Sequence, residues 1–202
     1  MARILYYGAP KNAPKTAFVY QNQTTSQEVE LSRYHFSDSF DIPAGDAVLK
    51  FLPRELLTDE SVPESAPQLK IPKEWKKVLI LVSEDLNNKT FPIRLNAIDA
   101  SDDVFGQGEI LFFNFSEVSV FGMVGEKKLI LKPETTALIS DPISDKGDYL
   151  VELDSIRNTI ETRRWLLRQT WHHQPKYRYV AFVLPMPKPR VAKIYSTPIR
   201  DF

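Results

Sequence analysis

The adjacent histidines His172 and His173 are the residues whose type most suggests chemistry, because imidazole is a metal ligand and a proton acceptor near neutral pH. Consecutive residues of a strand point to opposite faces, so this pair is poorly placed to chelate one ion. The chain has no cysteine, and its remaining histidine is His35. A metal site would need distant carboxylates, so we expect a polar turn over His172–Lys176, no metal and no cofactor.

Two tryptophans shortly before the histidines form a second constellation. Period-two alternation places Trp165, Leu167 and Trp171 on one face of a predicted strand, and Arg168 among basic side chains on the other. Exposed rings would offer a platform for sugar rings or a partner surface, whereas buried rings would be core. A leucine between two tryptophans favours core, which leaves the basic face to steer an acidic partner. The candidate ligand-binding residues are Trp165, Arg168, Trp171, His172, His173 and Tyr177.

Enzymatic motifs give no catalytic candidate. The sequence has no Gly-rich phosphate loop, no Gly-x-Ser-x-Gly elbow and no His-Glu-x-x-His pattern. Neighbouring acids occur, but acid/base catalysis needs carboxylates held apart across a cleft, which adjacency does not show. These pairs are Asp59-Glu60, Glu84-Asp85 and Asp102-Asp103. A hydrolase acting on glycans or esters, with a site assembled from distant residues, remains an alternative.

The segment 106–133 is the clearest group of positioning elements. Short runs of aromatic and branched residues are typical of strands, and they lie at Ile110–Phe113, Val118–Phe121 and Leu129–Leu131. Turn chemistry at Gly122–Gly125 separates the last two runs, and Pro133 ends pairing. The segment therefore predicts a three-stranded meander, which needs further strands for stability.

Similar runs continue along the chain. We expect 53–75 to be a Pro-rich surface loop, Val78–Val82 a central strand and Asp154–Glu161 a helical turn. A hairpin should join the strand around Trp165–Trp171 to a returning strand at Tyr177–Leu184, although the helix formers of RRWLLRQ leave a helix as the alternative for the first of these. The other predicted strands are Arg3–Gly8, Thr16–Tyr20, Glu28–Leu31, Phe36–Ile42, Ala47–Leu52, Phe91–Leu95, Tyr149–Leu153 and Val191–Tyr195.

The composition bounds the class of protein. The 202 residues can bury a core, and 15 prolines against 7 glycines, spread between short apolar runs, disfavour a helical protein. Lys plus Arg equals Asp plus Glu at 26 each, so no global field favours nucleic acid. No apolar run is long enough for a transmembrane helix, and the chain opens without the pattern of a signal peptide. We expect an all-β, antiparallel β-sandwich.

The two halves of the chain resemble each other. The similarity predicts two pseudo-repeated β units, 1–104 and 105–202, that share one core, with a single domain 1–202 as the alternative. Each block of the comparison needs its own offset, so chance similarity among strands also accounts for it. The matched blocks are Arg3–Gly8 with Glu109–Asn114, Thr16–Val19 with Ser119–Gly122, Phe40–Leu52 with Ile130–Ile139, and Val78–Val82 with Val180–Leu184.

The first 50 or so residues carry a family resemblance. An opening strand, the Ala-Pro connection Gly8–Pro14 and the turn Ile42–Gly45 before a β run resemble uncharacterised β-sandwich modules of exported bacterial proteins. The resemblance implies an extracytoplasmic accessory or adhesion-like domain, in the periplasm or at the cell surface. We therefore expect a non-catalytic binding module for protein or carbohydrate. A hydrolase and a structural assembly subunit are the alternatives.

Overall fold

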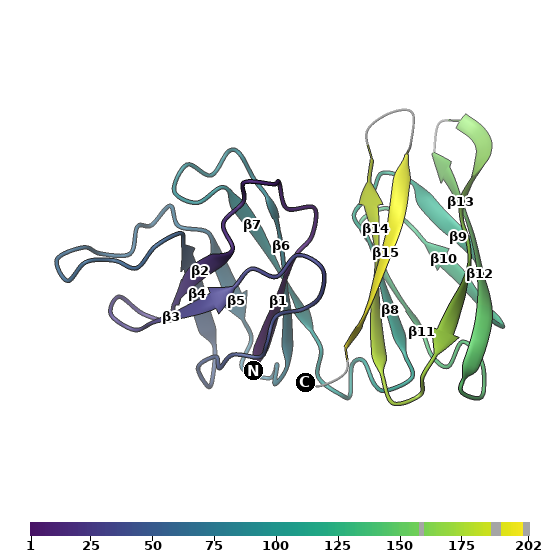
Figure 1. Cartoon of the computed structure of the whole chain (residues 1–202), viewed down its shortest axis with the longest axis horizontal. Helices are drawn as coiled ribbons and strands as arrows, with labels where there is room; N and C mark the ends of the chain where they lie inside the picture. Colours follow the sequence, from purple (N-terminus) through teal and green to yellow (C-terminus); the bar gives the residue numbers. More distant parts are fainter. Residues whose placement is uncertain (158–159, 187–190, 200–202) are drawn as a thin grey trace. The chain divides into compact units, whose positions relative to one another are not determined.

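The computed structural model describes residues 1–157, 160–186 and 191–199, with side chains except those of 160–162 (Figure 1). The described chain forms 15 strands in four mostly antiparallel sheets, which confirms the all-β prediction. Among these residues no helix is long and apolar enough to cross a membrane. The fold divides into two compact units, Met1–Val104 and Phe105–Asp201, hereafter unit 1 and unit 2.

Unit 1 contains one sheet of three strands, in the order β1-β6-β7, and one of four, in the order β3-β2-β4-β5. The apolar run VLILV forms the middle strand β6, as predicted. The strands are β1 Ala2–Tyr6, β2 Thr16–Tyr20, β3 Ser26–Glu30, β4 Ala47–Leu52, β5 Gln68–Ile71, β6 Val78–Glu84 and β7 Ile93–Asp99.

The core of unit 1 lies between the inner faces of its two sheets. Ile4, Val19, Phe51 and Ile80 are among the buried side chains of this cluster. The outer face of β2 and β4 is also covered, because Tyr20 and Leu52 pack beneath a separate cluster contributed by the chain after β4. Neighbouring residues of β2 and β4 thus face opposite sides of the sheet, one toward the core and the next toward the outer cluster.

Unit 2 contains two sheets of four strands, in the orders β10-β9-β12-β13 and β11-β8-β14-β15. Its core again lies between the inner faces, and it includes Phe112, Val120, Leu153 and Val183. The two units thus have hydrophobic clusters of their own. The strands are β8 Ile110–Asn114, β9 Ser119–Val124, β10 Lys127–Leu131, β11 Thr136–Ile139, β12 Gly147–Arg157, β13 Ile160–His173, β14 Arg178–Pro185 and β15 Ala192–Ile199.

The predicted meander forms only in part. β9 and β10 make the expected hairpin, but β8 belongs to the opposite sheet, so the prediction is wrong for its first link. The buried Asn114 side chain fixes the crossing, because its Nδ2 donates to the carbonyl of Val118 at 2.7 Å and its Oδ1 accepts from the Ser116 hydroxyl at 2.6 Å. The chain between β8 and β9 is therefore held by a fully hydrogen-bonded buried amide and does not form a hairpin turn.

Four further expectations are wrong. Phe36–Ile42 forms no strand and makes only a single bridge, from Phe40 to Ala2. The Pro-rich loop contains β5, which pairs with β4. Asp154–Glu161 forms no helical turn, because its described residues belong to β12 and β13. The predicted hairpin also fails, since β13 pairs with β12 whereas β14 pairs with β8 and β15 in the other sheet. The segment 174–177 therefore connects the two sheets of unit 2.

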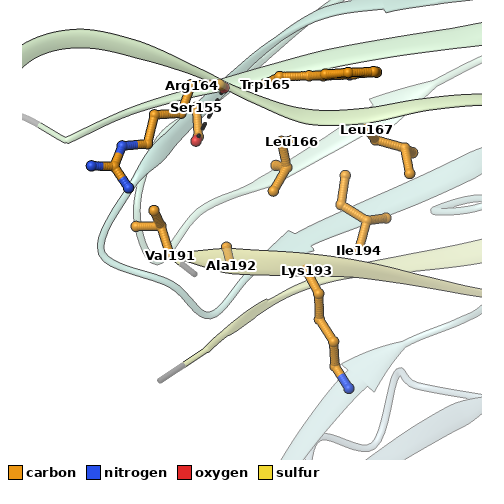
Figure 2. Close-up of a pocket in the computed structure, with 9 residues that line it drawn as sticks. All are labelled: Ser155, Arg164, Trp165, Leu166, Leu167, Val191, Ala192, Lys193 and Ile194. Carbon is orange, nitrogen blue, oxygen red and sulfur yellow. Dashed lines mark hydrogen bonds between the residues drawn. The ribbon is translucent and has the colours of Figure 1, made fainter. Parts of the chain in front are cut away.

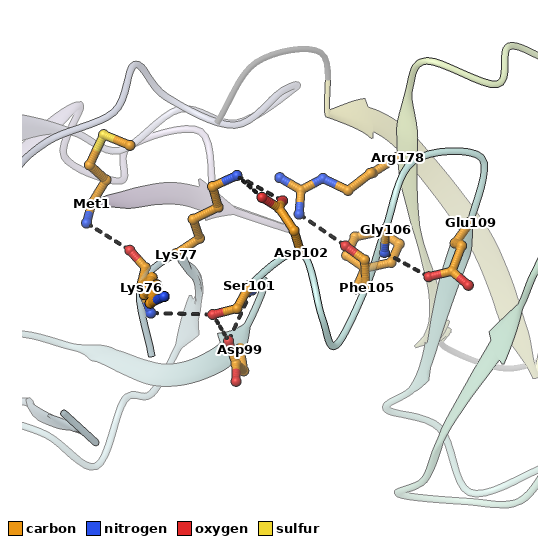
Figure 3. A network of polar contacts seen from close by, with 10 residues as sticks. All are labelled: Met1, Lys76, Lys77, Asp99, Ser101, Asp102, Phe105, Gly106, Glu109 and Arg178. Atoms are coloured by element: carbon orange, nitrogen blue, oxygen red, sulfur yellow. Dashed lines mark hydrogen bonds and ion pairs between the residues drawn. The ribbon is translucent and has the colours of Figure 1, made fainter. Parts of the chain in front are cut away.

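Polar contacts hold the chain on each side of the division between the units (Figure 3). In unit 1, the Lys77 ammonium pairs with Asp102 at 2.7 Å, and the Ser101 hydroxyl donates to Asp99 at 2.6 Å. In unit 2, Arg178 donates to the carbonyl of Phe105 at 3.0 Å with its guanidinium 5.4 Å from the Phe105 ring. The segment 100–104 between β7 and unit 2 is thus fixed by a hydrogen bond and an ion pair.

The strands of the two units pair in the same order. The first strand runs parallel to the sixth in unit 1 (β1 and β6), and β8 runs parallel to β14 in unit 2. β2 lies between β3 and β4, as β9 lies between β10 and β12. Three of the four matched sequence blocks fall on such equivalent strands, whereas β4 was matched with β11, which has a different place. Duplication of the sequence stays a prediction.

Candidate functional site: the bare face of unit 2

The outer face of the sheet β10-β9-β12-β13 carries apolar and charged side chains on the side away from the core. Directly opposed residues share a face, and the register aligns Ile130, Phe121, Asp154 and Trp165 across the four strands. The next row is Lys128, Met123, Glu152 and Arg168, and Leu150 lies beyond it. We call this set of nine residues the bare face.

A bulge in β13 places Trp165 on this face. Leu153 of β12 lies opposite Leu167, but the next residue, Asp154, lies opposite Trp165, so Leu166 is an extra residue. Leu166 and Leu167 both pack against the core, and the indole of Trp165 extends on the other side of the strand (Figure 2). Trp165 is 72% exposed. The prediction that Trp165 belongs to the core is therefore wrong, because alternation slips by one residue.

Asp154 is the electrostatic centre of the bare face. Its side chain is only 5% exposed, and it pairs with Arg163 and, at 3.2 Å, with Arg168. Arg168 also pairs with Glu152 at 2.9 Å. The Arg168 guanidinium lies 5.7 Å from the Trp165 ring, and that of Arg163 lies 5.3 Å from the Phe121 ring. Two arginines thus satisfy a buried carboxylate and hold the neighbouring rings.

The remaining predicted residues of β13 lie on both faces. Trp171 is half-buried, with its ring stacked 6.3 Å from that of Phe112 on the core side. His172 is exposed, and its Nδ1 lies 2.6 Å from a carboxylate oxygen of Asp148. His173 is 1% exposed, so the two histidines point to opposite faces as predicted. They end a strand, however, and the expected turn begins only after them.

His173 has neither ring nitrogen hydrogen-bonded among the described residues. Burial lowers the pKa of His173, and the nearby Asp141 partly opposes this shift. Tyr177 lies in the connection to β14, where its backbone N–H donates to Gln174 at 2.9 Å. The six candidate residues therefore do not form one site, since Trp165 and Arg168 belong to the bare face, Trp171 and His173 to the core side.

A pocket of about 390 Å³ lies where β13 and β15 approach each other (Figure 2). Both strands are the outermost of their sheets, so the pocket opens between two sheet edges. The inward Leu166, Leu167 and Ile194 line it, with Arg164 at one end. The complete lining is Ser155, Arg164, Trp165, Leu166, Leu167, Val191, Ala192, Lys193 and Ile194.

Sequence reasoning missed most residues of the bare face and of the pocket. Phe121 and Ile130 lie in predicted strands and Met123 in the predicted turn Gly122–Gly125, which β9 in fact enters, but only the pairing of β9 with β12 brings them beside Trp165. The sequence contains no local signal for that pairing. The bulge at Leu166 had one weak signal, namely two consecutive leucines that interrupt the alternation.

The bare face and the pocket present mainly apolar side chains and paired charges. Asp154 already accepts two arginines, and the lining of the pocket contains neither carboxylate nor histidine. Within the described ranges, no three His, Asp or Glu side chains cluster as metal ligands would. What the bare face offers is an exposed indole, four other apolar side chains and ordered charges.

Comparison of the sequence with models of known protein families gives no match, and comparison with curated proteins gives none either.

Proposed function

We propose that the protein is a non-catalytic binding module whose bare face contacts a partner protein. The observation that carries the proposal is the combination of an exposed Trp165 with Ile130, Leu150 and Met123, which are 61%, 50% and 40% exposed. Trp, Met and Arg are enriched in the centres of protein interfaces, and Trp and Arg dominate their binding energy. Arg168 of this face and the adjacent Arg163, both held by Asp154, fit that composition.

The same face supports carbohydrate less well. A sugar ring needs one or two flat aromatic platforms with hydrogen-bonding groups, and Trp165 beside Arg163 would meet that need. The exposed aliphatic residues lie on β10, β9 and β12, away from such a platform. A surface several strands wide matches a protein partner, and an extracytoplasmic role as an accessory module follows from the resemblance of the first residues.

The test is affinity capture with the whole chain as bait, in wild-type form and as Trp165→Ala with Ile130→Ser. The control is Leu86→Ser, because Leu86 is 67% exposed in unit 1 and lies off the bare face. We expect a protein that the wild type and the control retain and the double variant loses. Retention of the same proteins by all three baits contradicts the proposal, and Trp165-dependent binding to a glycan array instead assigns the face to carbohydrate.

A further inference from the structure

We infer that the partner contributes an extended segment of alternating apolar and acidic residues, which adds as a strand to β13 on the side away from β12. This inference rests on the proposed role as a protein-binding module. β13 is the outermost strand of its sheet and spans Ile160–His173. An edge strand directs alternate backbone groups away from its one neighbour, so it is a template for a further strand.

The two sides of such an added strand would meet different surfaces. Inward side chains would enter the pocket, where Leu166, Leu167 and Ile194 provide an apolar floor at the open edge of the sandwich. Outward side chains would extend the bare face beside Trp165 and Arg163, whose side chain is 65% exposed. Period-two alternation in the partner, apolar inward and polar outward, matches both surfaces at once.

Charge decides between an acidic partner and a second copy of this chain. The charged side chains described on β13 other than histidine are Arg163, Arg164 and Arg168, and the one on β15 is Lys193. Arg163 and Arg168 pair with Asp154 and Glu152 within the sheet, so the charged side chains that line the pocket are Arg164 and Lys193. In Figure 2 the Arg164 guanidinium projects at one end of the pocket, and the Lys193 ammonium points away from the pocket. Pairing of β13 with its own copy would bring arginines near arginines, which is unfavourable. A carboxylate-bearing strand is complementary instead.

Binding of a capped, fluorescent peptide of alternating valine and glutamate to the full chain tests this inference by anisotropy. We expect saturable binding that salt weakens, and about tenfold loss with Arg164→Glu, which the matching valine–lysine peptide should reverse. A peptide of the same composition with valines in one block and glutamates in another should bind poorly, because it cannot match both surfaces.

Two N-methylated forms of the peptide test whether it pairs with β13 through its backbone. N–H groups of alternate residues face the same side of a strand, so N-methylation of all valines or of all glutamates blocks opposite edges. One of these two peptides should keep its affinity and the other should lose it. Equal binding or equal loss rejects strand addition, and so does absence of binding by the unmodified peptide.

The two proposals can fail separately. If the peptide does not bind while a partner is still captured in a Trp165-dependent manner, the inference is wrong and the bare face remains a binding surface. Concentration-dependent self-association that Arg164→Glu strengthens would replace the acidic segment by a second copy of the chain. Peptide binding to a chain whose bare face captures nothing would place the site at the edge alone and reject the face.

Discussion

The two units treat the same sheet face in opposite ways. In unit 1 the outer face of β2 and β4 lies beneath the segment 53–67, whose Val62 and Ala66 are 5% and 4% exposed against Tyr20 and Leu52. In unit 2 the equivalent strands β12 and β13 end at Arg157 and begin at Ile160, which leaves no long segment between them, and Trp165 is 72% exposed. The fold itself therefore does not require a bare face, since one unit covers it with its own chain.

Hydrogen bonds show that the cover of unit 1 is fixed in place. The Tyr20 hydroxyl accepts from the backbone N–H of Leu56 at 2.7 Å, and Gln23 Oε1 accepts from that of Val62 at 2.8 Å. Arg54 and Glu60 form a two-bond ion pair within the segment. An aromatic residue on an outer face can therefore pack beneath a loop, as Tyr20 does, or remain exposed, as Trp165 does. The difference depends on whether a long segment follows the strand equivalent to β4.

Among the variants that compare the equivalent sheets, substitution of Gly122 should cause the largest loss of stability. Its φ is +152°, and a Cβ there would lie 1.9 Å from the carbonyl oxygen of Glu152, whereas the matched position of β2 holds the buried Val19. Gly122→Ala should lower the free energy of unfolding by about 3 kcal/mol or more. Urea denaturation measures this loss, with Gly45→Ala in unit 1 as control.

Gly45 also has a positive φ but open space around its Cβ position, so the control should cost only about 1 kcal/mol. Equal losses for the two variants would mean that β9 and β12 do not approach as closely as described.

A carboxylate introduced on the outer face of each unit should lower the stability of unit 1, where that face is covered, much more than that of unit 2, where it is bare. Val62→Asp buries a carboxylate beneath the cover of unit 1 and should lower the free energy of unfolding by about 3 kcal/mol. Leu150→Asp, on the half-exposed position of the bare face, should change it by less than about 0.5 kcal/mol. Urea midpoints of the two variants check this, and a similar shift for both would show that the bare face is also covered.

The tryptophans of β13 sharpen the comparison within unit 2. Trp171→Ala removes a ring stacked near Phe112 and should cost about 2 kcal/mol, whereas Trp165→Ala should cost less than about 1 kcal/mol. The emission lost with Trp165 should be red-shifted and readily quenched by iodide. A blue-shifted component, or a larger cost at Trp165 than at Trp171, would return Trp165 to the core.

The smallest expected effect is a dependence on pH that belongs to unit 2. Burial lowers the pKa of His173 below 6.5, so the unfolded chain binds this proton more readily than the folded one. The contribution to stability is therefore present above pH 6.5 and is lost as the pH falls below it. Hydrogen exchange of β13 across this range should show the weakening, and His173→Phe should flatten the profile. An unchanged profile in that variant assigns the dependence to other groups.

Local sequence predicted the strands better than their pairing. The runs VLILV and AVLKFL lie on β6 and β4 because a continuous or alternating apolar run needs no information from elsewhere in the chain. β5 was hidden among prolines as the short QLKI. The sheet to which β8 and β14 belong depends on the crossings at Asn114 and 174–177, which are properties of tertiary packing.

The site was less predictable than the fold for a related reason. Arg168, Trp165 and His172 could be singled out by type, but the carboxylate that organises the arginines, Asp154, comes from the neighbouring strand. The exposure of Trp165 depends on one unpaired residue of β13. Neither the neighbouring Asp154 nor the bulge can be deduced from the spacing of Trp165, Arg168 and His172 along the chain.

The extra residue Leu166 also has a genetic consequence. Odd-numbered residues before it, such as Arg163, share a face with even-numbered residues after it, such as Arg168. Loss of the Leu166 codon would make the alternation along β13 regular and would leave Trp165, Leu167 and Trp171 on the faces that they now occupy. Related chains that differ in length here should consequently be aligned with a gap at Leu166, so that the positions equivalent to Trp165 and Trp171 are each compared with residues of the same environment.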